Sequence, residues 1–269
     1  MLVRSPATSV LRPAVVMLHG YTATPEGEET VTGWTALSEQ HGVLVAYPQG
    51  TPTIASGFGW TTGAAHDATT GTDDVDVVAR VVQVLETMDC VDPSQIVIAG
   101  ESNGSGLGLL VACDSSTKNS IALFALAIPA VDVNVLQGCK NASPFPLLVM
   151  AGTEDATVPL HGGSVGGQPP FSAPLTWFKE IAKTVNGCRG FRSKGTPDAV
   201  HFFFDSCIVR ADFYEIVDGH HTWPGGPPGA GGLAPGAFPA SSLALCRAGV
   251  TMPVDPLPCS VLLGTFGLS

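Results

Sequence analysis

The sequence predicts an α/β fold, with a mostly parallel central sheet that is flanked by helices on both faces. Three observations predict it. Short apolar runs alternate with helix-like segments along the chain, which is typical of parallel strands joined by crossover helices. One of these runs ends in Gly-x-Ser-x-Gly and leads into a segment of small residues that can form a helix. The 269 residues suffice for one such domain with a full core.

The runs that predict strands span residues 14–18, 43–47, 96–99, 122–128, 146–151, 200–204 and 212–217. The segments that predict helices span residues 30–41, 73–88, 105–114 and 175–186. Asp73 and Asp74 stand at the start of the second helix, where acidic residues cap the first turn and favour its dipole. We expect the domain to cover residues 1–228, with a Gly- and Pro-rich extension at 229–269 packed on it.

The strand-like run before Ser102 ends in Gly100, and the second glycine of the motif is Gly104. A strand-to-helix turn this tight brings the backbone on either side of the serine close together, so side chains at the glycine positions would clash. The serine is then held in strained backbone geometry, with its hydroxyl projecting from the top of the sheet. The pattern predicts Ser102 as a nucleophile.

A serine hydroxyl needs a histidine to take its proton and a carboxylate to orient that histidine. In α/β-hydrolases the acid and then the histidine follow the serine along the chain, each after a strand. Asp155 follows one strand-like run, with Glu154 as its rival, and His220 and His221 follow another. Taken alone, the aspartate fits a turn or helix cap, and the histidine pair fits a solvated loop or a metal site. Their common order favours a catalytic set.

An early apolar run ends in His-Gly-Tyr-Thr at residues 19–22. A turn of this kind donates a backbone N–H to the oxyanion hole, together with the N–H of the residue after the nucleophile. These donors would be Tyr21 (or Thr22) and Asn103. We interpret His19 as a structural residue of the turn.

With these motifs in order, the chain resembles the esterase family that includes polyhydroxybutyrate depolymerases, feruloyl esterases and acetyl xylan esterases. The resemblance covers residues 12–228. It rests most on Asp-Asp-Val before a helix and on His-Thr-Trp-Pro-Gly, and it extends through VVMLHGYTATPEG, GVLVAYPQGT, GFGWTTGA, VDPSQIVIAGESNG and PFPLLVMAGTEDATVPLHGG. It implies an α/β-hydrolase with Ser102 as nucleophile, Asp155 as acid and His221 as base. Ser105 departs from a frequent glycine, and 229–269 departs from the family's closing helix.

The resemblance implies a serine esterase that needs no metal or organic cofactor. Its substrate would be a feruloyl, acetyl or polyester-type ester, including polymeric ones such as plant polysaccharide esters. Such esterases place aromatic residues near the acyl or leaving group, so Trp60 and Trp223, with Thr22, are candidates for the substrate pocket, although a core position fits both tryptophans equally well. Two alternatives stay open: a serine peptidase or acyltransferase on the same fold, and a non-catalytic binding protein.

The net charge is −11, and only 13% of the residues are charged, against about 25% in typical proteins. An acidic surface argues against nucleic acid or an anionic membrane as partner. No apolar run is long enough to span a membrane.

The chain has seven cysteines with neither C-x-x-C nor zinc-ligand spacing. In a chain that resembles secreted esterases, they indicate disulfides and a secreted or periplasmic location, although reduced cysteines in the cytoplasm are the alternative. We recognise no signal peptide in the first residues. The resemblance implies a Cys188–Cys207 disulfide. Our further expectations, which the sequence cannot fix, are Cys113–Cys139 and Cys246–Cys259, with Cys90 unpaired.

Overall fold

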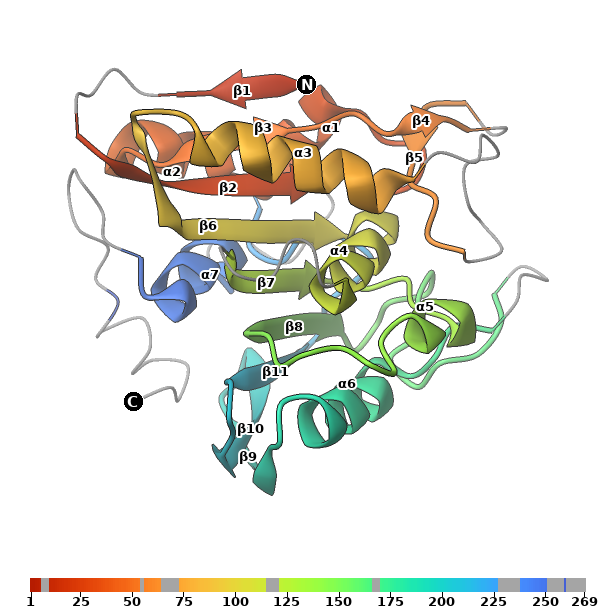
Figure 1. The fold of residues 1–269 in the computed structure, drawn as a ribbon. Coiled ribbons are helices and arrows are strands. Elements are labelled where there is room, and N and C mark those ends of the chain that lie inside the picture. Colours follow the sequence, from red (N-terminus) through yellow and green to blue (C-terminus); the bar gives the residue numbers. More distant parts are fainter. Residues whose placement is uncertain are drawn as a thin grey trace.

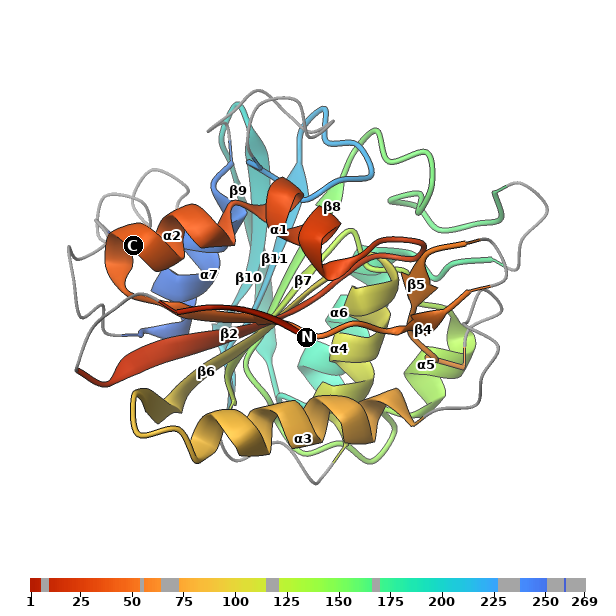
Figure 2. The same cartoon turned by 90° about the horizontal axis from the view of Figure 1, so that it is seen from above.

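The computed structural model of the protein describes residues 1–5, 10–53, 56–63, 73–114, 121–165, 170–226, 238–250 and 259. Its centre is a twisted sheet with helices on both faces (Figures 1 and 2). Nine described strands form the sheet, in the spatial order β1 (Leu2–Arg4), β3 (Leu44–Tyr47), β2 (Arg12–Leu18), β6 (Val91–Glu101), β7 (Ile121–Ala127), β8 (Leu147–Gly152), β11 (Ala211–Ile216), β10 (Ala199–Ser206) and β9 (Arg189–Gly195). Strands β4 (Thr51–Pro52) and β5 (Phe58–Gly59) form a separate pair.

The six strands from β3 to β11 are parallel, and antiparallel strands β1, β10 and β9 extend the two edges. All seven residues of β2 are buried, because a parallel strand in the middle of a sheet is covered on both faces. The predicted mostly parallel sheet is confirmed, as are all seven predicted strands.

Helices α3 (Asp74–Glu86), α4 (Asn103–Cys113), α5 (Val133–Gln137) and α6 (Pro174–Thr184) cover one face of the sheet. Helices α1 (Pro25–Thr32), α2 (Trp34–His41) and α7 (Ala240–Ala248) lie on the other face (Figure 2). Side chains of alternate residues in the central strands enter these two cores: Val16 and Leu18 point to the first, Val15 and Met17 to the second.

The single helix that the sequence predicts over residues 30–41 is wrong, because the structure has two helices there. Gly33 lies between them with a φ of 71°, a left-handed conformation that ends one helix and that glycine adopts without strain. The edge strand β9 was not predicted, since its sequence is polar and carries no apolar alternation.

The predicted extension at 229–269 contributes helix α7, which packs on strands β6 and β7 through Leu243 and Leu245. Of residues 229–269, the structure describes only 238–250 and 259. We propose that the extension belongs to the same domain, since α7 completes the core on one face of the sheet.

Three disulfides join Cys113 to Cys139, Cys188 to Cys207 and Cys246 to Cys259, and Cys90 is in none. These are the expected pairs. Each closes a short loop of chain, which typically stabilises a folded domain by about 2–4 kcal/mol. Within the described ranges, no helix is long and apolar enough to cross a membrane.

Candidate active site

Strand β6 leads through a sharp turn at Ser102 into helix α4. Ser102 has φ 53° and ψ −113°, a conformation that costs free energy for any residue other than glycine. A Cβ at Gly100 would lie 2.5 Å from the carbonyl oxygen of Gly104, and one at Gly104 would lie 2.2 Å from that of Leu18. Both glycines are therefore required, as the motif predicts, because the turn packs directly on itself and on β2.

Hydrogen bonds fix the turn from both sides. The carbonyl oxygen of Ser102 accepts from the N–H groups of Ser105, Gly106 and Ala130, at 3.0–3.1 Å. The hydroxyl of Ser105 is buried and lies 2.6 Å from the carbonyl oxygen of Gly100 and 2.8 Å from that of Ala127. A serine therefore suits this position, where the family often has glycine, because its hydroxyl has acceptors.

The side chains of Ser102, His221 and Asp155 form a continuous hydrogen-bonded chain. His221 Nε2 lies 2.9 Å from Ser102 Oγ, and its Nδ1 lies 2.8 Å from Asp155 Oδ2. A carboxylate only accepts hydrogen bonds, so Nδ1 carries the ring proton and Nε2 is left to accept from the serine hydroxyl. The Asp155 side chain is 1% exposed and the His221 side chain is 21% exposed. The carboxylate is therefore shielded from solvent, whereas the imidazole is partly accessible.

Asp155 is also the capping residue of its own turn. Its Oδ1 accepts from the N–H groups of Thr157 and Val158, at 2.8 and 2.7 Å, while Oδ2 faces His221. The turn-cap interpretation of Asp155 therefore holds, and the same turn aims the second carboxylate oxygen at the imidazole of His221.

The loops after β8 and β11 meet because two glycines allow it. A Cβ at Gly152 would lie 2.1 Å from the carbonyl oxygen of Gly219, and the same carbonyl accepts from the N–H of Glu154 at 2.9 Å. The N–H of Asp218 donates to Thr153 Oγ1 at 2.9 Å. These contacts between the two loops place Asp155 and His221 within hydrogen-bonding distance of each other.

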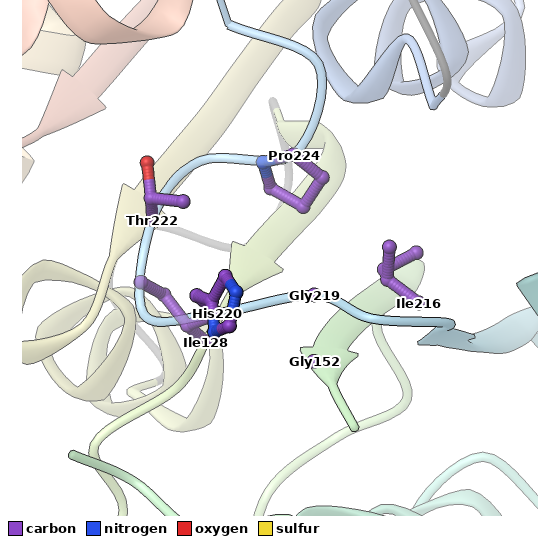
Figure 3. Close-up of a pocket in the computed structure, with 7 residues that line it drawn as sticks. All are labelled: Ile128, Gly152, Ile216, Gly219, His220, Thr222 and Pro224. Atoms are coloured by element: carbon purple, nitrogen blue, oxygen red, sulfur yellow. The ribbon is translucent and has the colours of Figure 1, made fainter. Parts of the chain in front are cut away.

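The two rival residues pair with each other at the surface. His220 Nδ1 lies 3.3 Å from the carbonyl oxygen of Glu154, its Nε2 lies 3.8 Å from the Glu154 carboxylate, and both side chains are 57% exposed. A cavity of about 10 Å³ adjoins His220, and Figure 3 shows the residues that line it. Its lining residues are Ile128, Gly152, Ile216, Gly219, His220, Thr222 and Pro224. It has the size of one water molecule, so it is not a substrate site.

The turn after β2 lies beside the nucleophile. A Cβ at Gly20 would lie 3.7 Å from Ser102 Cβ. His19 holds this turn: its Nε2 accepts from the N–H of Gly50 at 3.0 Å, so its Nδ1 carries the proton and donates to the carbonyl oxygen of Gly20 at 2.8 Å. Burial lowers the pKa of His19, which keeps this neutral form, so His19 is a structural residue as expected.

No protein-family model matches the chain. The chain is 32% identical over 189 residues to feruloyl esterase B of Piromyces equi, covering 67% of the chain and only 34% of that longer protein. It is 29% identical over 110 residues to a poly(3-hydroxybutyrate) depolymerase of Ralstonia pickettii, covering 38% of the chain and 22% of that protein. The structure matches acetyl xylan esterase from Aspergillus awamori with a TM-score of 0.58 at 14% identity, covering 99% of the chain and 93% of that esterase.

The chain has the α/β-hydrolase fold. Its predicted resemblance to esterases with these three names is confirmed by the matches.

The two tryptophans that the sequence suggests for the substrate pocket are both fully buried, which is the core position that the sequence allowed as the alternative. The main-chain N–H of Trp60 donates to Asn103 Oδ1 at 2.7 Å, and Asn103 Nδ2 donates to the main-chain oxygen of Trp60 at 3.1 Å. The indole N–H of Trp60 donates to the carbonyl oxygen of His19 at 2.8 Å. Trp223 donates to Ser241 Oγ at 2.9 Å. Trp60 therefore joins Asn103 to the turn after β2, and Trp223 joins the loop after β11 to helix α7. Thr22 is exposed beside the site, and its pocket role stays a prediction.

Sequence reasoning missed two glutamates, the buried Glu28 in α1 and the half-buried Glu101, which directly precedes Ser102. Glu28 is 2% exposed, and burial with the nearby Glu101 charge raises its pKa well above the usual range. Burial raises the pKa of Glu101 to about 7, against the opposing effects of His221 and the Trp223 N–H. The sequence could have pointed to Glu101, because it is a charged residue that directly follows an apolar strand.

Proposed function

We propose that the protein is a serine carboxylic ester hydrolase with Ser102 as nucleophile, His221 as general base and Asp155 as the acid that orients the base. The observation that carries the proposal is a pair of hydrogen bonds: His221 Nε2 lies 2.9 Å from Ser102 Oγ, and His221 Nδ1 lies 2.8 Å from Asp155 Oδ2. The serine itself is held at a strained turn. Elements far apart in the sequence supply the three side chains, so a structural role for any one of them does not explain the arrangement.

In this mechanism His221 Nε2 accepts the proton of Ser102 Oγ as the oxygen attacks the ester carbonyl carbon. The tetrahedral intermediate collapses, and His221 returns the proton to the departing alcohol, which leaves the acyl group on Ser102. Water then attacks the acyl-enzyme with His221 again as base, which releases the acid and restores the serine. Asp155 holds the ring tautomer and stabilises the imidazolium ion.

The oxyanion would be stabilised by the backbone N–H groups of Tyr21 and Asn103. Asn103 is the first residue of α4, and the first N–H groups of a helix have no partner within it and carry its positive dipole end. Tyr21 follows Gly20, which lies against Ser102. Each such donor typically contributes about 3–4 kcal/mol to transition-state stabilisation.

We propose feruloyl and acetyl esters of plant polysaccharides as the substrates, with polyesters as the alternative. The names feruloyl esterase, acetylxylan esterase and poly(3-hydroxybutyrate) depolymerase among the relatives support this range. The partly exposed His221 supports access by a polymeric ester. Three disulfides support a secreted or periplasmic location, because disulfides persist in oxidising compartments.

The test is hydrolysis of p-nitrophenyl butyrate by the wild type and by Ser102→Ala, with thermal unfolding of both as the check on folding. Turnover by the wild type alone supports the proposal, and methyl ferulate, acetylated xylan and poly(3-hydroxybutyrate) then separate the substrate classes. Substantial turnover by folded Ser102→Ala overturns the mechanism. Faster cleavage of an amide analogue than of the ester would favour a peptidase instead.

A further inference from the structure

The two proposed oxyanion donors, the backbone N–H groups of Tyr21 and Asn103, come from distant parts of the chain. Tyr21 lies in the turn after β2, and Asn103 opens helix α4. Donors of this kind are effective because they are held in place before the oxyanion forms. The segment of residues 57–61 contacts both parts of the chain. It contains strand β5 and Trp60, and the mechanism proposed above gives it no role.

On one side, this segment holds the residues before and after the first donor. The indole N–H of Trp60 donates to the carbonyl oxygen of His19 at 2.8 Å, and the two rings lie 4.7 Å apart between their centroids. The N–H of Phe58 donates to the carbonyl oxygen of Ala23 at 3.2 Å. Tyr21 lies between the two residues that accept these hydrogen bonds, so its backbone is held from both directions.

On the other side, the segment is bound by the side chain of Asn103. The backbone N–H of Trp60 donates to Asn103 Oδ1, and Asn103 Nδ2 donates to the backbone oxygen of Trp60. A side-chain amide carries both a donor and an acceptor, so it satisfies both polar groups of one backbone residue. Asn103 is 6% exposed, which shields these hydrogen bonds from water. The residue that supplies the second donor is therefore tied to the tryptophan that holds the first.

The end of the segment is bound by Asp74. Asp74 Oδ2 accepts from the N–H of Thr61 at 2.6 Å, and the residue is 3% exposed. Its neighbour Asp73 is exposed and caps α3, since it accepts from the N–H of Asp76 at 3.1 Å. The sequence gives both aspartates the same capping role. The structure separates them, because Asp73 caps the helix whereas Asp74 binds the 57–61 segment.

We propose that Asp74 and the side chain of Asn103 are positioning residues that fix the two oxyanion donors relative to each other through the 57–61 segment. This inference rests on the proposed function of the site. It gives Asn103 two tasks, since its backbone N–H would stabilise the oxyanion while its side chain holds the segment that fixes the other donor. Trp60 is the residue that contacts both parts of the chain, which gives this buried tryptophan a role in addition to core packing.

Replacement of Asp74 tests the proposal without touching either donor. Asp74→Ala removes the acceptor of the Thr61 N–H and should lower kcat on p-nitrophenyl butyrate by about 10- to 100-fold. KM should stay within about threefold, because misplaced donors weaken binding of the transition state rather than of the substrate. Asp74→Asn keeps an acceptor oxygen, so its kcat should lie within about threefold of wild type.

Asp73→Ala is the matched control. It removes the helix cap next to Asp74 and should lower Tm, as the loss of a cap does. Its kcat should stay within about twofold of wild type, as is usual for a change at the surface. A general loss of stability at the start of α3 is thereby separated from a loss of donor placement.

A transition-state analogue reports on the donors more directly. When a trifluoromethyl ketone binds, Ser102 Oγ bonds to the ketone carbon, the carbonyl oxygen becomes an oxyanion, and the serine proton moves to His221. The inhibition constant should rise in Asp74→Ala by the same factor by which kcat/KM falls. Asp73→Ala should leave the inhibition constant unchanged.

A measurement that needs no turnover is the ¹H–¹⁵N spectrum. The amide signals of Tyr21 and Asn103 should shift in Asp74→Ala and stay in place in Asp73→Ala. A wild type without ester turnover would refute the proposed function, and the amide signals would then decide the positioning role by themselves.

The proposal is overturned if folded Asp74→Ala keeps the kcat of an active wild type, or if its Tyr21 and Asn103 amide signals do not shift. It is also overturned if Asp74→Asn or Asp73→Ala loses as much kcat as Asp74→Ala, because neither change should displace the segment.

If Asp74→Ala does not fold, Trp60→Phe decides the question. This variant keeps an aromatic ring and removes the hydrogen bond to the carbonyl oxygen of His19. Its kcat should fall by about tenfold, and a kcat equal to wild type overturns the proposal.

Discussion

The substitution Asp155→Asn isolates the electrostatic and tautomeric role of the acid. Asn keeps an oxygen where Asp155 Oδ1 accepts from the N–H groups of Thr157 and Val158, so the turn remains capped. The amide nitrogen would replace Oδ2, 2.8 Å from His221 Nδ1, and it can only donate. The imidazole proton is then forced to Nε2, which faces the Ser102 hydroxyl and can no longer accept its proton.

The expected magnitude follows from these contacts. The wrong tautomer is expected to lower kcat by about 10⁴-fold, the size found for such a substitution in a serine protease triad. Stability should change little, because the two capping hydrogen bonds survive. Asp155→Ala removes both and should cost about 1–3 kcal/mol of unfolding free energy, since a net hydrogen bond contributes about 0.5–1.5 kcal/mol.

The assay is kcat on p-nitrophenyl butyrate together with urea unfolding. Glu154→Gln is the matched control, since its side chain is 57% exposed and lies near His220 at the surface, and it should keep kcat within about twofold, as surface changes usually do. A kcat for folded Asp155→Asn within tenfold of wild type would refute the reasoning, because it would mean that the aspartate neither sets the tautomer nor stabilises the imidazolium.

Three other variants test the frame of the site. Gly104→Ala places a Cβ 2.2 Å from the carbonyl oxygen of Leu18 and should cost about 3 kcal/mol or more of unfolding free energy; a Tm equal to wild type would mean that the turn is not tightly packed. Trp60→Phe removes an indole donor to a buried carbonyl and should lower the unfolding free energy by about 1–3 kcal/mol, with KM unchanged. A raised KM would mean that the Trp60 ring contacts the substrate. Replacing Cys188 and Cys207 by serine should cost about 2–4 kcal/mol with kcat/KM unchanged, and a loss of activity without a loss of Tm would contradict that.

The ordered motifs were enough to predict the fold and the hydrogen-bonded residues Ser102, His221 and Asp155, because such motifs depend on the local path of the backbone. A strand that ends in Gly-x-Ser-x-Gly has few ways to turn, and the predicted order of acid and base follows from parallel strands whose carboxyl ends share one edge. The choice of Asp155 over Glu154 came from the family resemblance. The structure shows its physical reason: the Asp155 carboxylate contacts the His221 imidazole, whereas the Glu154 carboxylate is 57% exposed and lies near His220.

Other features depend on contacts between distant segments, which the sequence does not display. The tryptophans are buried rather than at the surface, where Trp60 pairs with Asn103 and Trp223 with Ser241. The break at Gly33 was within reach of sequence reasoning, since an isolated glycine in a helical pattern is a candidate helix end.

The central claim is that the folded site activates Ser102, and a serine-reactive fluorophosphonate tests it most directly. The account predicts one covalent adduct per molecule, which peptide mass spectrometry places on Ser102. Labelling should be absent in Ser102→Ala and greatly slowed in His221→Ala. A folded wild-type protein that forms no adduct, or one that is labelled elsewhere, would contradict the account.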